Sequence, residues 1–139
     1  MGKTAAVLGH EVTGELVEIG TDTIVLGLRG TDYRLHLAVD GPVTAPLNKP
    51  ITGRIAARAR RVDIVGRGGR YIEPVYGRPR RLQGTVVGAD RRANTLAVRG
   101  GGGCTFVCSL LPDQAALDFQ AGTLVACDIE SGAKFVRSE

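Results

Sequence analysis

The sequence predicts an all-β protein in which two similar small β-barrels follow one another along the chain. Three observations lead to this prediction. Short runs of alternating apolar and polar residues recur throughout, bounded by glycine-rich turns. The same order of runs occurs twice, with a period of about 70 residues. The chain has twenty glycines and only 4% aromatic residues, which suits many tight turns around a core of aliphatic side chains.

Eight runs have the alternation expected of half-buried strands. They are GELVEI (14–19), TIVLGL (23–28), YRLHLAV (33–39), TGRIAAR (52–58), GTVVGA (84–89), TLAVR (95–99), TFVCSL (105–110) and GTLVACDI (122–129). Turn-forming residues separate them at Gly20–Asp22, Arg29–Asp32, Ala89–Asn94 and Gly100–Gly103. One short helical turn is expected within PDQAALDF, capped by Asp113 and ended by Phe119.

The stretch RIAARARRV (54–62) is the one run with two interpretations, because Ile55, Ala59 and Val62 have helical spacing. Its counterpart in the second copy, TLVACDI, is rich in β-forming residues and has no helical stripe. The repeat therefore favours a strand.

The repeat divides the chain into a first unit (1–66), a connector rich in Arg, Gly and Pro (67–81) and a second unit (82–139). Gly14 matches Gly84 in the first strands, where a glycine commonly marks a bulge or bend. The other matched positions are Leu16 with Val86, Thr23-Ile24 with Thr95-Leu96, Leu35 with Val107, Gly53 with Gly122, Ile55 with Leu124, and Ile64-Val65 with Phe135-Val136.

Four or five short antiparallel strands and one helical element in about 60 residues are typical of an OB-like barrel. The order GTVV…TLAV…GGG…TFVCSLL…DF…GTLVACDIESGAKFV resembles the small barrels of the Mop/TOBE type, and tandem Mop proteins share this length and two-copy plan. The resemblance implies binding of molybdate-type oxyanions by a Lys-Ser-Thr type segment before the last strand and by backbone amides at subunit interfaces. Here that segment is Glu130-Ser131-Gly132-Ala133, and the first unit has Arg60-Arg61-Val62-Asp63.

Positive charge is concentrated in one part of the sequence. Residues 54–81 contain nine arginines, no lysine and two acids, a net charge of +7, whereas the segments on either side are slightly acidic. Arg54, Arg58 and Arg60 alternate with apolar residues, so one face of this strand is expected to be basic. Arginine forms bidentate contacts with phosphate and carboxylate groups, which suits an acidic partner.

Two tyrosines lie among the arginines of the connector, where their rings could stack on bases while the guanidinium groups hold phosphates. The predicted nucleic-acid-binding residues are Arg54, Arg58, Arg60, Arg70, Tyr71, Tyr76, Arg78, Arg80 and Arg81. The alternative is that Tyr71 and Tyr76 fasten the connector to the two units while the arginines face water or pair with neighbouring acids. The loop GRGGR lacks the GxxxxGK[ST] order of a phosphate-binding loop.

The remaining polar residues give no sign of catalysis. HEVTG does not continue into HExxH, and no Ser/His/Asp or Cys/His spacing stands out, so we expect neither an enzyme nor a cofactor. Cys104, Cys108 and Cys127 lie in apolar stretches and are interpreted as buried thiols, with a metal or redox pair as the alternative. No apolar run is long enough to span a bilayer, and the first twelve residues lack the features of a signal peptide, which indicates a cytoplasmic protein that does not enter membranes.

Three functions of different classes are consistent with these patterns. The first is a module that binds single-stranded nucleic acid, or an acidic protein, through the arginine-rich stretch. The second is a Mop-like protein that binds small oxyanions. The third is a scaffold whose open strand edges form a homo-oligomer.

Overall fold

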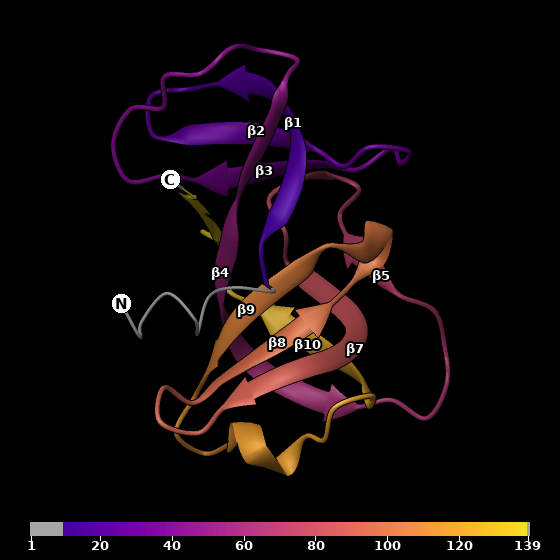
Figure 1. Ribbon diagram of the computed structural model, residues 1–139. Coiled ribbons are helices and arrows are strands. Elements are labelled where there is room, and N and C mark those ends of the chain that lie inside the picture. The colour runs from indigo at the N-terminus through magenta and orange to yellow at the C-terminus, as the bar shows by residue number, and fades with distance from the viewer. Residues whose placement is uncertain (1–9, 139) are drawn as a thin grey trace.

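The computed structural model describes residues 10–138 and is all-β, as predicted (Figure 1). The start of the chain, on which the signal-peptide expectation depends, lies outside the described residues. The strands are β1 (Val12–Ile19), β2 (Thr23–Gly27), β3 (Arg34–Ala38), β4 (Pro50–Ile64), β5 (Tyr71–Glu73), β6 (Tyr76–Gly77), β7 (Arg81–Asp90), β8 (Thr95–Arg99), β9 (Thr105–Leu110), β10 (Leu124–Ile129) and β11 (Lys134–Arg137). Two 3₁₀ turns, η1 (Gly101–Gly103) and η2 (Ala116–Asp118), are the helical elements of this part of the chain.

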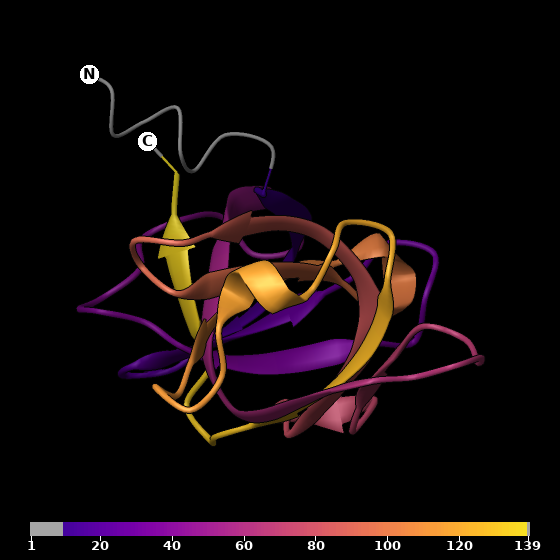
Figure 2. The same cartoon turned by 90° about the horizontal axis from the view of Figure 1, so that it is seen from below.

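The eleven strands belong to one mixed sheet rather than to two separate ones, in the order β1-β2-β3-β11-β4-β10-β7-β8-β9, with β5 paired to β7 and β6 to β3. Additional pairings join β1 to β4 and β4 to β9. Three pairs are parallel, namely β3–β11, β3–β6 and β4–β9. Seen from below, the strands curve around the core instead of lying in a flat layer (Figure 2).

β4 holds the sheet together. It is fifteen residues long and pairs along its length with β1, β11, β9 and β10. The strand interpretation of residues 54–62 is therefore confirmed, and the helical one is excluded. The buried aliphatic residues of both halves of the chain form a single cluster, which includes Leu26 of β2 and Val98 of β8.

The first strands of the two predicted units have the same irregularity. The register of β1 with β2 shifts between Leu16 and Glu18, and that of β7 with β8 shifts between Val86 and Gly88. The match of Leu16 with Val86 is thus confirmed. It places Gly14 and Gly84 at the same position before each bulge.

Later matches between the units are wrong in register. Leu35 of β3 is opposite Leu26, and the residue in the corresponding place on β9 is Phe106, which is opposite Val98. Val107, the predicted counterpart, is the next residue. The error arises because the turns before these two strands differ in length by one residue.

The predicted match of Gly53 with Gly122 is also wrong. Gly14 is opposite Ile51 and Gly84 is opposite Val125, so Gly53 corresponds to Cys127 rather than to Gly122. Ile55 then corresponds to Ile129, not Leu124. Gly122 stands in a turn with φ 91°, whereas a Cβ on Gly53 would lie 2.5 Å from the ring of Phe135. Gly122 supplies a positive φ, whereas Gly53 permits close packing. The amino-acid sequence does not distinguish these two uses of glycine.

The helical turn η2 is shorter than expected and has a different cap. Phe119 is its C-cap, in agreement with the prediction, but its first N–H groups are not capped by Asp113. The Ala116 amide donates to the side-chain oxygen of Asn94, at 2.8 Å, from the β7–β8 turn. A cap supplied from 22 residues away cannot be found by local pattern.

Candidate functional site

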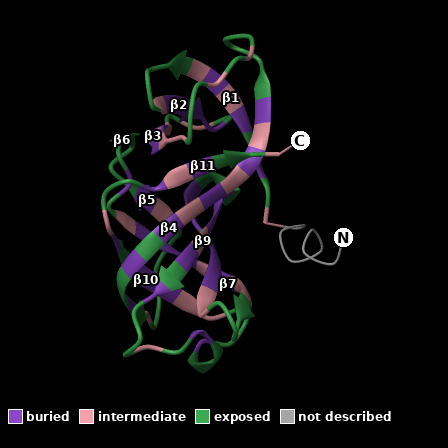
Figure 3. Cartoon of the chain, turned by 90° about the vertical axis from the view of Figure 1, so that its left-hand side faces the viewer, coloured by how far each residue is buried: buried purple, intermediate pink, exposed green. Residues whose placement is uncertain are grey.

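The outer face of β4 carries the first group of predicted arginines. Ile55, Ala57 and Ala59 are buried, whereas Arg58 and Arg60 are exposed, so the expected alternation is present (Figure 3). The register of β10 with β4 shifts opposite Arg60, since Ile129 pairs with Ala59 and the preceding residue, Asp128, pairs with Arg61. This bulge leaves two consecutive arginines exposed before Val62 returns to the core.

The end of β10 brings the β4 arginines close to the start of β7. The Glu130 amide donates to the carbonyl of Arg58 at 2.8 Å, and the Ile129 amide donates to the carbonyl of Arg80 at 2.9 Å. Residues that are far apart in the sequence therefore flank one short segment. We call Arg58, Arg60, Arg80 and Arg81 the arginine cluster.

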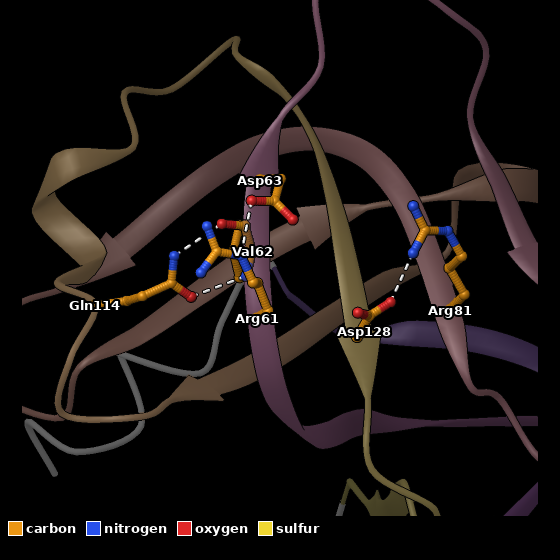
Figure 4. A network of polar contacts seen from close by, with 6 residues as sticks. All are labelled: Arg61, Val62, Asp63, Arg81, Gln114 and Asp128. Atoms are coloured by element: carbon orange, nitrogen blue, oxygen red, sulfur yellow. Dashed lines mark hydrogen bonds and ion pairs between the residues drawn. The ribbon is translucent and has the colours of Figure 1, made fainter.

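Acids compensate part of this charge. Arg81 forms an ion pair of 2.6 Å with Asp128, and Arg61 forms one of 2.9 Å with Asp63 (Figure 4). A hydrogen bond with Tyr71 and the charge of Asp128 raise the pKa of Arg81, so it remains cationic. Within residues 10–138, Arg58, Arg60 and Arg80 form no ion pair.

The connector is fastened to both halves of the molecule. The Ile72 amide donates to the Tyr33 hydroxyl at 3.1 Å, and the Gln83 side chain donates to the Gly69 carbonyl at 2.9 Å. The half-buried Tyr71 donates from its hydroxyl to Gln83 at 3.1 Å. Tyr76 remains 64% exposed, with its ring 5.0 Å from that of His36. Of the two predicted stacking residues, one is thus engaged in packing and the other is open to solvent.

The remaining predicted arginines lie outside the cluster. Arg70 and Arg78 are exposed on the connector. Arg54, on the first part of β4, is partly buried and lines a groove of about 1110 Å³ over β4, β7, β8 and β9. The structure therefore brings four of the seven predicted arginines together and distributes the other three.

Two arginines that the sequence interpretation missed also line this groove. Arg91 and Arg92 are in the turn between β7 and β8 and line the groove together with Arg54. Their segment, ADRRAN, indicates a turn by its sequence pattern, and that pattern does not predict a binding role. Two adjacent arginines in a short turn were the available signal, although their distance in sequence from residues 54–81 separated them from the basic stretch.

A smaller pocket of about 230 Å³ lies at the end of β10. Its lining includes Ser131 and Gly132 of the segment that corresponds to the Mop oxyanion segment, together with Arg58 and Lys134. Glu130 also lines it, and Lys134 pairs with Asp40 at 3.1 Å. An acid inside the pocket and a compensated lysine reduce its attraction for an anion.

The three cysteines are buried, as predicted. Burial raises the pKa of the Cys104 thiol to about 12. A hydrogen bond with Cys127, together with burial, raises the pKa of Cys108 well above its ordinary value. Over residues 10–138, no three His, Cys, Asp or Glu side chains are grouped so that they could hold a metal ion. Cys104 and Cys108 are therefore poor nucleophiles in the folded chain.

Comparison with protein families, characterised proteins and solved structures gives no match to this chain. Among the described residues, there is no helix with the length and apolar character needed to cross a membrane. Functional inference therefore depends on the surface chemistry described above.

Proposed function

We propose that the chain is a non-enzymatic module that binds single-stranded nucleic acid, or another polyanion, through its arginine-rich surface. The observation that carries this proposal is the uncompensated charge of the arginine cluster, in which three exposed arginines form no ion pair within residues 10–138. Exposed guanidinium groups offer paired N–H donors to phosphate oxygens. A concentrated patch of one sign also accelerates the association of an oppositely charged partner.

Sequence preference should be weak, because little of this surface can recognise a base. Tyr71 already uses its hydroxyl in a bond to Gln83, and Tyr76 is the exposed aromatic residue of the connector. Contacts to phosphate fix the position of a strand but carry no sequence information. Any preference is expected to come from stacking at Tyr76.

The salt dependence of affinity tests the proposal. About four phosphates neutralised at residues 54–81 should contribute about −3 to the slope of the logarithm of affinity for a labelled oligonucleotide against the logarithm of salt concentration. The variant R78Q/R80Q/R81Q should reduce the steepness of the slope by about 2 while it remains folded, since the exposed Arg81–Asp128 pair contributes at most about 1 kcal/mol. Fluorescence anisotropy at several salt concentrations measures both quantities.

A matched control removes three exposed cations from outside the arginine cluster, as in R29Q/K49Q/R137Q. It lowers the net charge by the same amount and should leave the slope nearly unchanged. No binding by the native chain at low salt, or equal losses of affinity in the two triple variants, would contradict the proposal. Residues 67–81 would then serve only as a connector.

A finer architecture that we propose for this module is a pair of OB-like barrels that exchange their last strands. Two closed circuits of pairings support it. One runs β1-β2-β3-β11-β4 and returns to β1, and the other runs β7-β8-β9-β4-β10 and returns to β7. Each circuit has five members and one parallel pair, β3–β11 or β9–β4. The second part of β4 and the whole of β11 would be the exchanged strands.

The two other functions have weaker support. A Mop-like oxyanion site would need a net positive pocket, and the pocket at Ser131 contains Glu130. A scaffold that assembles through strand edges would need long unpaired edges. Most strands between residues 10 and 138 have a partner on both sides, and β5 and β6, which do not, are only three and two residues long.

A further inference from the structure

The groove over β4, β7, β8 and β9 has a floor of short side chains in register. Gly88 is opposite Ala97, Ala97 is opposite Val107, and Val107 is opposite Ala56. These four residues form a row across four strands, and all of them line the groove. The His10 ring lies over Gly88 at one end of this row, where an added Cβ would be 3.3 Å from it. Beside that ring the short side chains of Ala97, Val107 and Ala56 allow an extended chain to approach the sheet.

Cationic groups surround this floor. Arg54 lines it on β4, and Arg91 and Arg92 line it from the β7–β8 turn. The single acid in the lining, Asp90, accepts a hydrogen bond from the Ala93 amide at 3.1 Å and so helps to form the turn. Three arginines against one acid give the groove a positive potential, and its concave shape concentrates that potential.

Two residues of the groove lining each have a buried polar atom without a hydrogen-bond partner. Among residues 10–138, the buried side-chain polar atoms without a partner are Nδ1 of His10, Nε of Arg54 and Nε2 of His36. The first two belong to residues that line the groove. A buried guanidinium N–H without an acceptor is unfavourable, and an anionic ligand would provide the acceptor.

The groove also leads to the arginine cluster. Ser109, which lines the groove, is opposite Arg58 in the β4–β9 ladder. Ser109 and Ala56 line the smaller pocket as well, and Arg58 lines it with them. One anionic chain could therefore contact the groove arginines and then the cluster without leaving the surface.

We infer that this groove holds the sugar-phosphate backbone of a single strand, with phosphates at Arg54 and at the Arg91–Arg92 pair. The inference rests on the proposed function and adds a second contact region to it. The rings of Phe, Tyr and Trp are absent from the described lining. Recognition in the groove therefore involves phosphates rather than stacked bases.

Two variants test the groove by its charge and by its geometry. R91Q/R92Q removes two exposed charges from a turn, so the slope of log affinity against log salt should become shallower by about 1.4. R54K keeps the charge but loses the Nε–H and the planar fork. It should weaken oligonucleotide binding about threefold with the slope unchanged. R29Q/K49Q is the control, matched in charge with the first variant.

An abasic oligonucleotide of the same length provides a direct test of backbone recognition. It should compete with a labelled oligo(dT) within about threefold on the variant Y76A/R78Q/R80Q/R81Q, which loses the exposed ring of the connector and retains every described residue of the groove lining. Weaker competition by tenfold or more would overturn the inference.

The outcomes separate this inference from the proposed function. If R91Q/R92Q binds like R29Q/K49Q while R78Q/R80Q/R81Q loses affinity, the groove inference is wrong and the proposed function stands. If the native chain does not bind at low salt, both are wrong. If R91Q/R92Q reduces the salt slope by about 1.4 and R78Q/R80Q/R81Q reduces it by about 2, the groove is part of the binding surface.

Discussion

Glycines in the first strand of each unit show what a single residue decides in this fold. A Cβ on Gly84 would lie 2.1 Å from the carbonyl oxygen of Arg99, and one on Gly14 would lie 2.7 Å from Cγ of Leu26. The bulge comes three positions after each glycine, between Val86 and Gly88 in the second unit. The glycines therefore permit close approach of the neighbouring strand, and the bulge is formed by the residues that follow.

Gly84→Ala should destabilise the protein strongly for this reason. The contacted atom belongs to the backbone of β8 and cannot rotate away, so the strands must separate, at a cost of about 3 kcal/mol. Urea unfolding followed by circular dichroism measures the loss. Gly66→Ala is the control, since nothing lies within 4 Å of its added Cβ, and it should change stability by less than about 0.5 kcal/mol. Equal stability of the two variants would mean that β7 and β8 adjust freely.

At the scale of elements, β4 shows how much a strand depends on partners outside its own sequence. β9 pairs with it only as far as Leu110, opposite Ala59. Beyond that point the side chain of Gln114 takes the place of a strand. It accepts a hydrogen bond from the Val62 amide and donates one to the Val62 carbonyl, each at 2.8 Å (Figure 4). A side-chain amide has the donor and acceptor geometry of a peptide group, which explains the substitution.

Gln114→Ala should therefore cost about 1–3 kcal/mol, because it leaves both backbone groups of Val62 without this partner. Gln114→Glu should be no better than alanine, since the carboxylate cannot donate to the Val62 carbonyl. Thermal unfolding of the two variants, with the exposed Gln120→Ala as control, measures the effect. A Glu variant as stable as the native chain would show that the donated bond contributes nothing.

Most elements could be predicted from the sequence because their signals are local. The eight predicted strands are present, since alternation and turn residues specify a half-buried strand without reference to its partners. β5, β6 and β11 are not among the eight, because segments of three, two and four residues are too short to show alternation. Arg91 and Arg92 were missed for a related reason. Their role in the groove depends on strand pairing, which makes them part of the same groove lining as Arg54 although 37 residues separate Arg91 from Arg54 in sequence.

For the whole molecule, the decisive feature is one that local pattern cannot reveal. β4 begins beside β1 and ends beside β10, and β11 from the end of the chain pairs with β3 and β4 near its beginning. A repeat in the sequence predicts two similar units, but it does not say which unit receives each strand. The division at residues 66 and 82 therefore stays a prediction about the sequence, while the sheet itself is continuous.

This continuity predicts that both halves unfold together. The buried cluster that contains Leu26 of β2 also contains Cys108 and Cys127 of β9 and β10, so neither half can open without exposing part of the core of the other. In urea, amide exchange of β2 and thiol labelling should report the same free energy of unfolding within about 1 kcal/mol. Both can be read by mass spectrometry on one sample.

Cys104 and Cys108 are suitable probes because the raised pKa of each thiol suppresses its ionisation in the folded chain. With its pKa raised to about 12, Cys104 has almost no thiolate at pH 8. Labelling of this thiol therefore requires unfolding. The two signals would separate if the halves were independent, because β2 would then exchange at a urea concentration at which the thiols stay protected. Coincident transitions are expected because the buried residues of the fifteen-residue strand β4, from Ile51 to Val62, belong to one core. Part of β4 therefore cannot unfold without disrupting the rest of that core.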